Sequence, residues 1–232
     1  MEGAERCNCV LSARVRRLEE NANIPPLYRM ATFENFSTRP DNPVVHRTLQ
    51  TAMTVANSYA RELPFGTKKQ GLLFLGDPGT GKTHLAVAVL RRLMARGFEC
   101  LFWDYQGLLD KIRSSYNAAS GAGDREAYRT ALDCEILLLD DLGAHRVSDW
   151  VEDTITSIIT HRCNHNKPLL ATTNLRDPEA GDGQLPSGAA GEMAGKYYLS
   201  ERIGLRARSR LFEMCRLVST RGVEDYRMRK GV

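Results

Sequence analysis

The sequence predicts an α/β fold in which a parallel central sheet carries helices on both faces. Short runs of consecutive apolar residues recur from position 71 onward, as expected for strands that are buried on both sides of a sheet. A stretch suited to a helix follows each run, and this alternation implies parallel strands joined by right-handed crossovers. The predicted strands are residues 71–75, 100–103, 135–140 and 168–173.

Helices are predicted between and after these strands. We expect them at residues 81–96, 106–116, 148–165 and 199–214, with Ser148 as an N-cap. Stretches rich in small and polar residues, 118–124 and 176–195, are predicted as loops. On an open sheet of this kind, ligands bind at the carboxyl ends of the strands.

The N-terminal part of the chain has a different character. We expect residues 1–45 to form an arm that docks a partner, because a short predicted helix is followed by two prolines and a turn-rich segment. Phe33 and Phe36 in that segment look exposed. A predicted helix over 46–62 then begins the main domain, residues 46–232.

The first strand is followed by GDPGTGKT, which fits the phosphate-binding P-loop pattern G-x-x-x-x-G-K-[ST] at every fixed position. Its glycines let backbone N–H groups point at phosphate oxygens, and the N-terminus of the next helix adds positive potential. Lys82 is expected at the β- and γ-phosphates, and the Thr83 hydroxyl suits Mg²⁺. The residues predicted to bind nucleotide are Gly76, Asp77, Pro78, Gly79, Thr80, Gly81, Lys82, Thr83 and His84.

Further polar residues end two later strands. Asp140 ends a buried strand that we expect beside the P-loop strand, so we assign it to Mg²⁺ together with Thr83. Asp141 is the candidate for polarising the attacking water, with a turn or helix cap as the alternative. Asn174 is predicted to reach the γ-phosphate or that water, unless it only forms a turn.

Taken together, these segments resemble the DnaC/IstB-like branch of the AAA+ ATPases. The resemblance rests on GDPGTGKTHLA, LLLDDLG, ATTNL and RSRLFE in that order, preceded by IPPLYRMATFENF. It implies a P-loop NTPase of the AAA+ type, a three-layer sandwich around the parallel sheet, that uses ATP and Mg²⁺. Too few residues follow Arg210 for a full C-terminal helical lid.

The same resemblance implies roles for late residues. Asn174 would be the sensor residue, and GLRARSRL, residues 204–211, would carry an arginine finger. Arg210 is the predicted finger, acting on the ATP of a neighbouring subunit in a homo-oligomer, and Arg206 is the second choice; a solvated helix face is the alternative for both. Arg162 is a weaker candidate for the subunit interface. The predicted catalytic set is Lys82, Asp141, Asn174 and Arg210.

Three functions compete for this site. A DnaC-like loader would use ATP to place a replicative helicase on single-stranded DNA, whereas an IstB-like helper would activate a transposase. A small P-loop kinase is the third hypothesis, but the paired aspartates and the late arginines fit a ring ATPase better. Lys111, Arg113 and Tyr116 form a candidate DNA patch, with a solvated helix face as the equal alternative.

Composition bounds the class of protein. The net charge of +4 is too small to indicate nucleic acid by itself, although the chain from Lys196 onward is locally basic, which suits either a solvated face or an anion-facing surface. No apolar run approaches the about 20 residues of a membrane span, so we expect a cytoplasmic protein without membrane contact.

Two smaller questions stay open at this stage. Cys7 and Cys9 form a C-x-C pair, which cannot supply a closed zinc site alone, so we expect no metal there. Tyr28, Phe33 and Phe36 either border the adenine base or fix the arm to the core.

Overall fold

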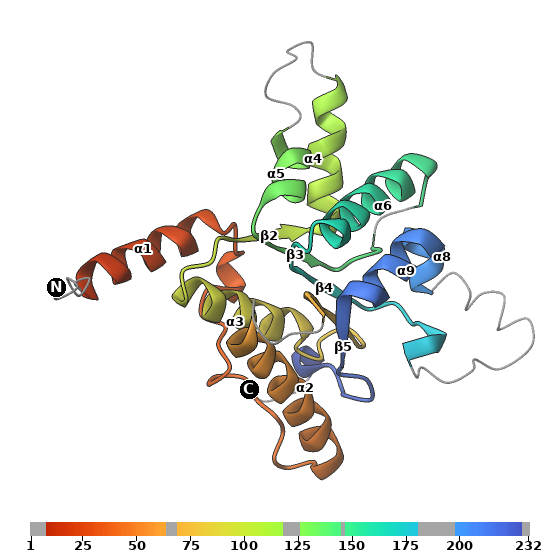
Figure 1. Ribbon diagram of the computed structural model, residues 1–232. Coiled ribbons are helices and arrows are strands. Elements are labelled where there is room, and N and C mark those ends of the chain that lie inside the picture. The colour runs from red at the N-terminus through yellow and green to blue at the C-terminus, as the bar shows by residue number, and fades with distance from the viewer. Residues whose placement is uncertain (1–7, 64–68, 118–125, 145–146, 181–197, 229–232) are drawn as a thin grey trace, which may run out of the picture.

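The computed structural model describes residues 8–63, 69–117, 126–144, 147–180 and 198–228 (Figure 1). Its centre is a five-stranded sheet with the order β2-β3-β4-β1-β5, in which every neighbouring pair is parallel. The predicted parallel α/β sheet is therefore confirmed. The strands are β1 (Gly71–Leu75), β2 (Cys100–Asp104), β3 (Ile136–Asp140), β4 (Leu169–Thr173) and β5 (Cys215–Ser219).

The strand order corrects one expectation about the site. The strand that ends at Asp140 does not lie beside the P-loop strand, because β4 is inserted between them. Ala171 of β4 pairs with Leu73 of β1 on one side and with Leu139 of β3 on the other. Runs of buried apolar residues identify strands but do not encode their order, which depends on where each crossover returns to the sheet.

The described helices alternate with the strands. Local sequence starts some of them: the Asn42 side chain accepts a hydrogen bond from the Val45 N–H at 3.3 Å, and Ser148 caps its helix through the Val151 N–H, as predicted. The helices are α1 (Asn8–Asn21), α2 (Pro43–Glu62), α3 (Lys82–Ala95), α4 (Tyr105–Asn117), α5 (Glu126–Asp133), α6 (Asp149–Asn164), α8 (Leu199–Ile203) and α9 (Leu205–Met214). Short 3-10 turns are η1 (Pro26–Tyr28), η2 (Pro178–Ala180) and η3 (Tyr226–Met228).

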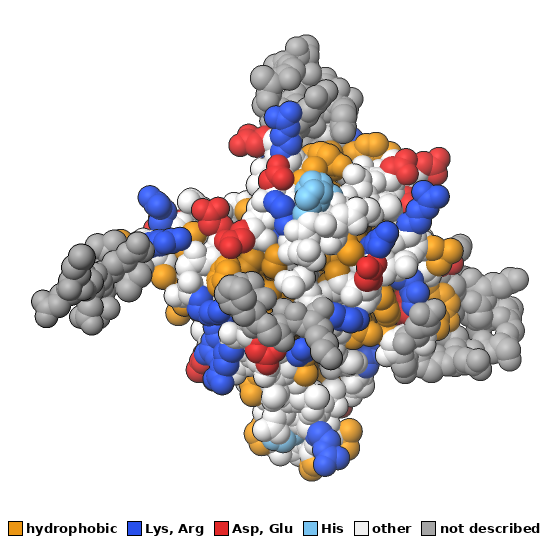
Figure 2. All heavy atoms as spheres, in the orientation of Figure 1, with side chains coloured by type: hydrophobic (Ala, Val, Ile, Leu, Met, Phe, Trp, Pro, Cys, Tyr) orange, Lys and Arg blue, Asp and Glu red, His pale blue; other side chains and the backbone are white. Residues whose placement is uncertain are grey.

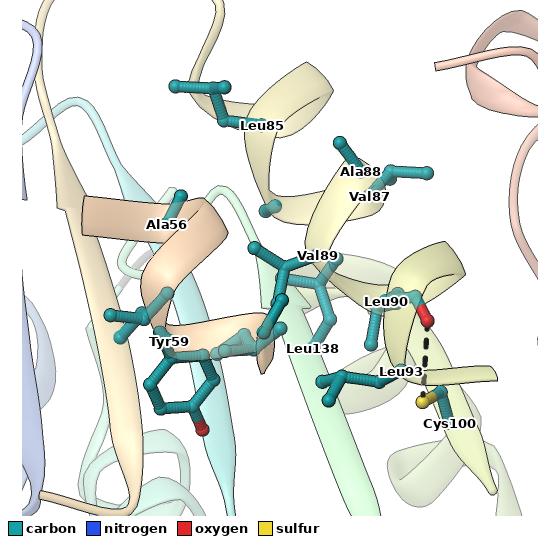
Figure 3. Close-up of a cluster of buried hydrophobic side chains, with 14 of the residues drawn as sticks. Ala56, Tyr59, Leu85, Val87, Ala88, Val89, Leu90, Leu93, Cys100 and Leu138 are labelled. Atoms are coloured by element: carbon teal, nitrogen blue, oxygen red, sulfur yellow. Dashed lines mark hydrogen bonds between the residues drawn. The ribbon is translucent and has the colours of Figure 1, made fainter. Parts of the chain in front are cut away.

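Two apolar layers hold the sheet between helices. Leu72 and Phe74 of β1 face a core shared with α2 and α3, part of which Figure 3 shows around Tyr59 and Leu90. Leu73 and Leu75 point to the opposite side, where α4, α5, α6, α8 and α9 pack. Alternate residues of one strand thus serve both cores, as the pleat requires. The predicted three-layer sandwich is confirmed.

Three elements differ from the sequence prediction. Helix α5 lies just after the loop predicted at 118–124, and β5 is a strand that was not assigned. The single helix expected over 199–214 is divided at Gly204, whose φ is 80°. A Cβ there would lie 2.2 Å from Glu152 Oε1, so both the backbone angle and the crowding favour glycine.

The segment after α1 packs more closely than an arm would. Ala22, Ile24, Ala31 and Phe33 are buried in the core of the α2–α3 face, and the Phe102 N–H donates to the Ala22 carbonyl at 2.8 Å. The expectation that Phe33 is exposed is therefore wrong. Helix α1 itself extends away from the sheet (Figure 1). The division into an arm and a main domain stays a prediction.

The described surface is mixed in charge. On the face shown in Figure 2, basic and acidic side chains are interspersed with apolar ones. None of the helices in the described part of the chain is long and apolar enough to cross a membrane.

Candidate nucleotide-binding site

The P-loop connects the end of β1 to the start of α3, as the motif predicts. Lys82 is only 6% exposed, and its Nζ donates to the Asp77 carbonyl at 2.8 Å. Burial lowers the pKa of Lys82 to about 8, against the opposing influence of the Asp141, Asp140 and Asp77 carboxylates. Burial thus makes the charged form of Lys82 less favourable than it is in water, and the three carboxylates partly offset this effect.

Asp140 lies at the carboxyl end of β3 and faces the P-loop. Its Oδ1 accepts hydrogen bonds from the hydroxyls of Thr83, at 2.8 Å, and Thr172, at 2.7 Å. Burial raises the pKa of Asp140, and these two hydrogen bonds oppose that change. A hydroxyl and a carboxylate so close together are hard oxygen donors of the kind that Mg²⁺ takes, so the residues fit this ion.

Asp141 directly follows the end of β3 and differs from Asp140 in its backbone conformation. Its φ of 56° lies in the left-handed region, and its N–H donates to Thr172 Oγ1 at 2.9 Å. Asn174 Nδ2 donates to Asp141 Oδ1 at 2.6 Å. Burial raises the pKa of the Asp141 carboxyl, while Lys82 lowers it. A left-handed backbone is uncommon for a non-glycine residue, and Asp is one of the residue types that adopt it most readily.

Strand β4 explains how these groups meet. Because β4 lies between β1 and β3, Thr172 and Asn174 at its end lie between the P-loop and the two aspartates. Thr172 bonds to both aspartates and was missed by the sequence analysis, although the polar ending Thr172-Thr173-Asn174 was the available signal. The structure thus brings the predicted residues Lys82, Thr83, Asp140, Asp141 and Asn174 to one place.

A cavity of about 650 Å³ opens over these residues. His84 also lines it, and one ring nitrogen, Nε2, lies 2.8 Å from the Thr32 carbonyl. Of the aromatic residues considered for the base, Tyr28 and Phe36 line the cavity, whereas Phe33 is buried with Arg92 over its ring. The cavity lining also includes Asp104 of β2 and a C-terminal segment around Tyr226, which no sequence pattern had linked to the P-loop.

The two arginine-finger candidates lie elsewhere. Arg206 and Arg210 line a separate groove of about 780 Å³ between α6 and α9, and neither lines the P-loop cavity. Arg210 is exposed and pairs with Glu213 at 2.7 Å. Neither arginine serves the P-loop of its own chain in this arrangement, so a role in hydrolysis would have to be exerted on another copy.

The prediction for Arg162 is wrong. It was expected at a subunit interface, but it is completely buried. Its guanidinium donates hydrogen bonds to backbone carbonyls where α5 ends and where β3 and β4 begin. These hydrogen bonds explain why an arginine can be buried in the core. These carbonyls belong to Ala131, Leu132, Cys134, Glu135 and Pro168.

The other expected sites are only partly described. Lys111 and Arg113 are exposed on α4, and Arg113 lies over the Trp150 ring at 4.7 Å. The side chain of Tyr116 lies outside the described residues, as do those of Cys7 and Cys9. DNA contact at α4 stays a prediction.

Comparison with known proteins gives a consistent family. The family model described as IstB-like ATP binding protein matches residues 10–179. Replicative helicase loader DnaC of Escherichia coli (strain K12) is 24% identical over 166 residues, which cover 71% of this chain and 64% of that protein. Uncharacterized protein YqaM of Bacillus subtilis (strain 168) is 25% identical over 219 residues, 92% of this chain and 61% of that protein. The chain thus spans less than two thirds of these curated relatives.

A solved structure agrees with the fold. The crystal structure of the DnaC helicase loader matches with a TM-score of 0.65 and 28% identity, over 84% of this chain and 99% of that chain. The architecture is therefore that of a P-loop AAA+ domain. Within the described residues, the chain after β5 forms only the short turn η3.

Proposed function

The chain belongs to the IstB-like ATP binding proteins, and from that premise we propose that it is an ATPase that loads a replicative helicase on single-stranded DNA; its similarity to the replicative helicase loader DnaC supports the helicase part of this proposal. One observation carries the enzymatic part of the proposal. Thr83, Asp140, Asp141 and Asn174 converge beside Lys82, with hydrogen bonds of 2.6 to 2.8 Å linking them in pairs.

Each residue has a distinct role in the proposed reaction. The P-loop N–H groups and Lys82 would bind the phosphates of ATP, and Thr83 with Asp140 would hold Mg²⁺, which would supply positive charge to the phosphate groups. Asp141 accepts a proton from the attacking water while Asn174 orients the carboxylate and the γ-phosphate. Arg210 of a neighbouring copy, or Arg206 as the second choice, stabilises the transition state.

Hydrolysis by the purified protein, with and without single-stranded DNA, tests the enzymatic proposal. We expect Lys82→Ala to lose ATP binding, and Asp141→Asn to bind ATP but to lower kcat by roughly 10²- to 10⁴-fold. A wild-type rate that Asp141→Asn leaves unchanged would show that another group activates the water.

The partner is tested separately. The helicase proposal rests on similarity to the DnaC loaders, at 24% identity for the relative and 28% for the solved structure. We expect the protein, loaded with ATP, to retain the replicative helicase of its own cell in a pull-down. Retention of a transposase instead would favour the second candidate, an IstB-like transposition helper, which the matching family model supports.

A further inference from the structure

Asp177 is a buried carboxylate that lines neither the P-loop cavity nor the groove between α6 and α9. It lies three residues after Asn174 in the sequence. The Arg208 guanidinium donates to both of its oxygens, from Nε to Oδ2 and from Nη2 to Oδ1, each at 2.6 Å. A bidentate contact of this kind fixes the relative orientation of the two side chains as well as the distance between them.

Arg208 lies on α9 between Arg206 and Arg210, but it does not line the groove that those two arginines line. Residues four positions apart on a helix share a face, and the residue midway between them lies on another side. Accordingly, Arg206 and Arg210 are exposed, whereas the Arg208 side chain is only 13% exposed and lies over the Phe212 ring at 4.4 Å. The ion pair therefore holds α9 from a side other than its groove face.

Residues 174–177 link the end of β4 to this ion pair, and the link is held along its length. The Leu175 carbonyl accepts a hydrogen bond from Arg221 Nη2 at 2.7 Å. The Arg176 carbonyl accepts one from the Leu199 N–H, at the start of α8, at 2.9 Å. The end of β4 and helix α9 are thus joined by a short segment whose position is fixed by its neighbours.

We propose that the Asp177–Arg208 ion pair is a positioning device that holds α9 where its groove arginines can reach the ATP of a neighbouring copy. The inference rests on the proposed function, in which an arginine of this groove acts on the next subunit. Asn174, at the start of the linking segment, donates to Asp141 in the P-loop cavity of its own chain at 2.6 Å. The ion pair thereby connects the site where one chain would bind ATP to the arginines that it offers to the next chain.

A mixed oligomer tests the inference, because an ion pair that only stabilises the fold would be needed equally in every chain. In a mixture of Lys82→Ala and Arg210→Ala, the first chain supplies the arginine and the second supplies the ATP site. If Arg206→Ala proves to be the inactive variant, it replaces Arg210→Ala. Asp177→Asn is placed in one chain or in the other, and the recovered ATPase rate is measured.

With Asp177→Asn in the chain that supplies the arginine, we expect the recovered kcat to fall by about 10- to 100-fold. The KM for ATP should stay the same, because ATP binds to the other chain. With Asp177→Asn in the chain that supplies the ATP site, the recovered rate should not change. Glu19→Gln is the control: it breaks the ion pair between Glu19 and Arg91, and it should leave the rate unchanged in either chain.

A second variant separates the loss of the ion pair from the cost of leaving a charge unpaired. The double variant Asp177→Leu/Arg208→Met removes both charges together, a change that buried ion pairs often tolerate without loss of stability. In the chain that supplies the arginine, it should lower the recovered kcat as Asp177→Asn does. Urea unfolding of each variant establishes that the chain is folded in the assay.

Several results would overturn the positioning role while leaving the proposed function intact. An equal loss in whichever chain carries Asp177→Asn would mean that the ion pair only stabilises the fold. A loss confined to the chain that supplies the ATP site would mean that it acts through Asn174 on its own site. An unchanged rate, or a double variant with the full rate, would mean that α9 is positioned without it.

Failure of the proposed function has a different signature. If the wild type hydrolyses ATP but neither Arg210→Ala nor Arg206→Ala recovers activity when mixed with Lys82→Ala, no arginine acts between copies. The positioning role then falls with that part of the proposal.

Discussion

Lys82 is the residue whose chemistry depends most on its surroundings. It is buried beside three carboxylates, and burial is the dominant influence that lowers its pKa to about 8. In the free protein, most Lys82 side chains are therefore charged only below that pH. The charged form is the one that attracts the phosphates. The nucleotide triphosphate is already fully ionised there, since phosphate groups lose their last proton near pH ~6.

ATP affinity should consequently fall as the pH rises through about 8. Above that value, each pH unit should weaken binding by about tenfold, because the fraction of protonated Lys82 falls by that factor. Titration of Kd between pH 6.5 and 9.5, at roughly constant ionic strength, measures the effect. Lys82→Arg is the control, because a guanidinium stays charged throughout this range and its profile should be flat; a flat wild-type profile would contradict the assignment.

The Thr172 hydroxyl contacts both aspartates, Asp140 through its carboxylate and Asp141 through its backbone N–H. It donates to Asp140 and accepts from the Asp141 N–H. Thr172→Val removes both bonds and keeps the shape of the side chain, so we expect kcat to fall by about 10- to 100-fold with little change in ATP affinity. Thr172→Ser keeps the hydroxyl and should recover most of the rate. A Thr172→Val protein with normal kcat would show that the aspartates are positioned by other groups.

At the scale of elements, the prediction succeeded where burial was continuous along the chain. Strand β1 was predicted with the bounds that are observed, because Gly71–Leu75 is apolar at every position after the glycine. Strand β5 was missed because Arg216 interrupts its apolar pattern, and only its pairing with β1 at the sheet edge makes it a strand. Helix α5 was missed because it is short and follows a polar stretch.

The candidate site was predictable in composition and not in arrangement. Lys82, Thr83, Asp140, Asp141 and Asn174 come from motifs that carry their own chemistry. That Thr172 joins the two aspartates depends on β4 lying between β1 and β3, a long-range feature that no local pattern contains. The C-terminal segment around Tyr226 is distant from the P-loop in sequence and carries no recognisable nucleotide-binding motif, so only folding brings it to the cavity.

The break between α8 and α9 sets the direction of the helix that carries Arg206 and Arg210. Gly204→Ala should destabilise the protein by about 1–3 kcal/mol, because the residue has a φ of 80° and a Cβ would clash with Glu152. Gly222 is the matched control: its φ is 71°, but a Cβ there meets nothing within 4 Å. Gly222→Ala should therefore lower the free energy of unfolding by a smaller amount, through its backbone angle alone. Urea unfolding measures both, and equal losses would show that the Glu152 contact is unimportant.

In the whole molecule, the P-loop cavity and the groove that contains Arg206 and Arg210 are separate. Lys82 lines one and Arg210 lines the other, so a complete site requires two copies of the chain if Arg210 is the finger. This geometry makes a prediction that no single variant tests. A chain without Lys82 can still supply Arg210, and a chain without Arg210 can still bind ATP.

Mixing Lys82→Ala with Arg210→Ala should therefore restore part of the ATPase activity that each lacks alone. In a mixed oligomer, some interfaces combine an intact P-loop with an intact Arg210, and the recovered rate should depend on total protein concentration. Arg206→Ala in place of Arg210→Ala identifies which arginine acts, because only the true finger variant needs rescue. If Arg210→Ala and Arg206→Ala are both fully active alone at every concentration, hydrolysis does not use an arginine from this groove. In that case the two cavities belong to separate functions.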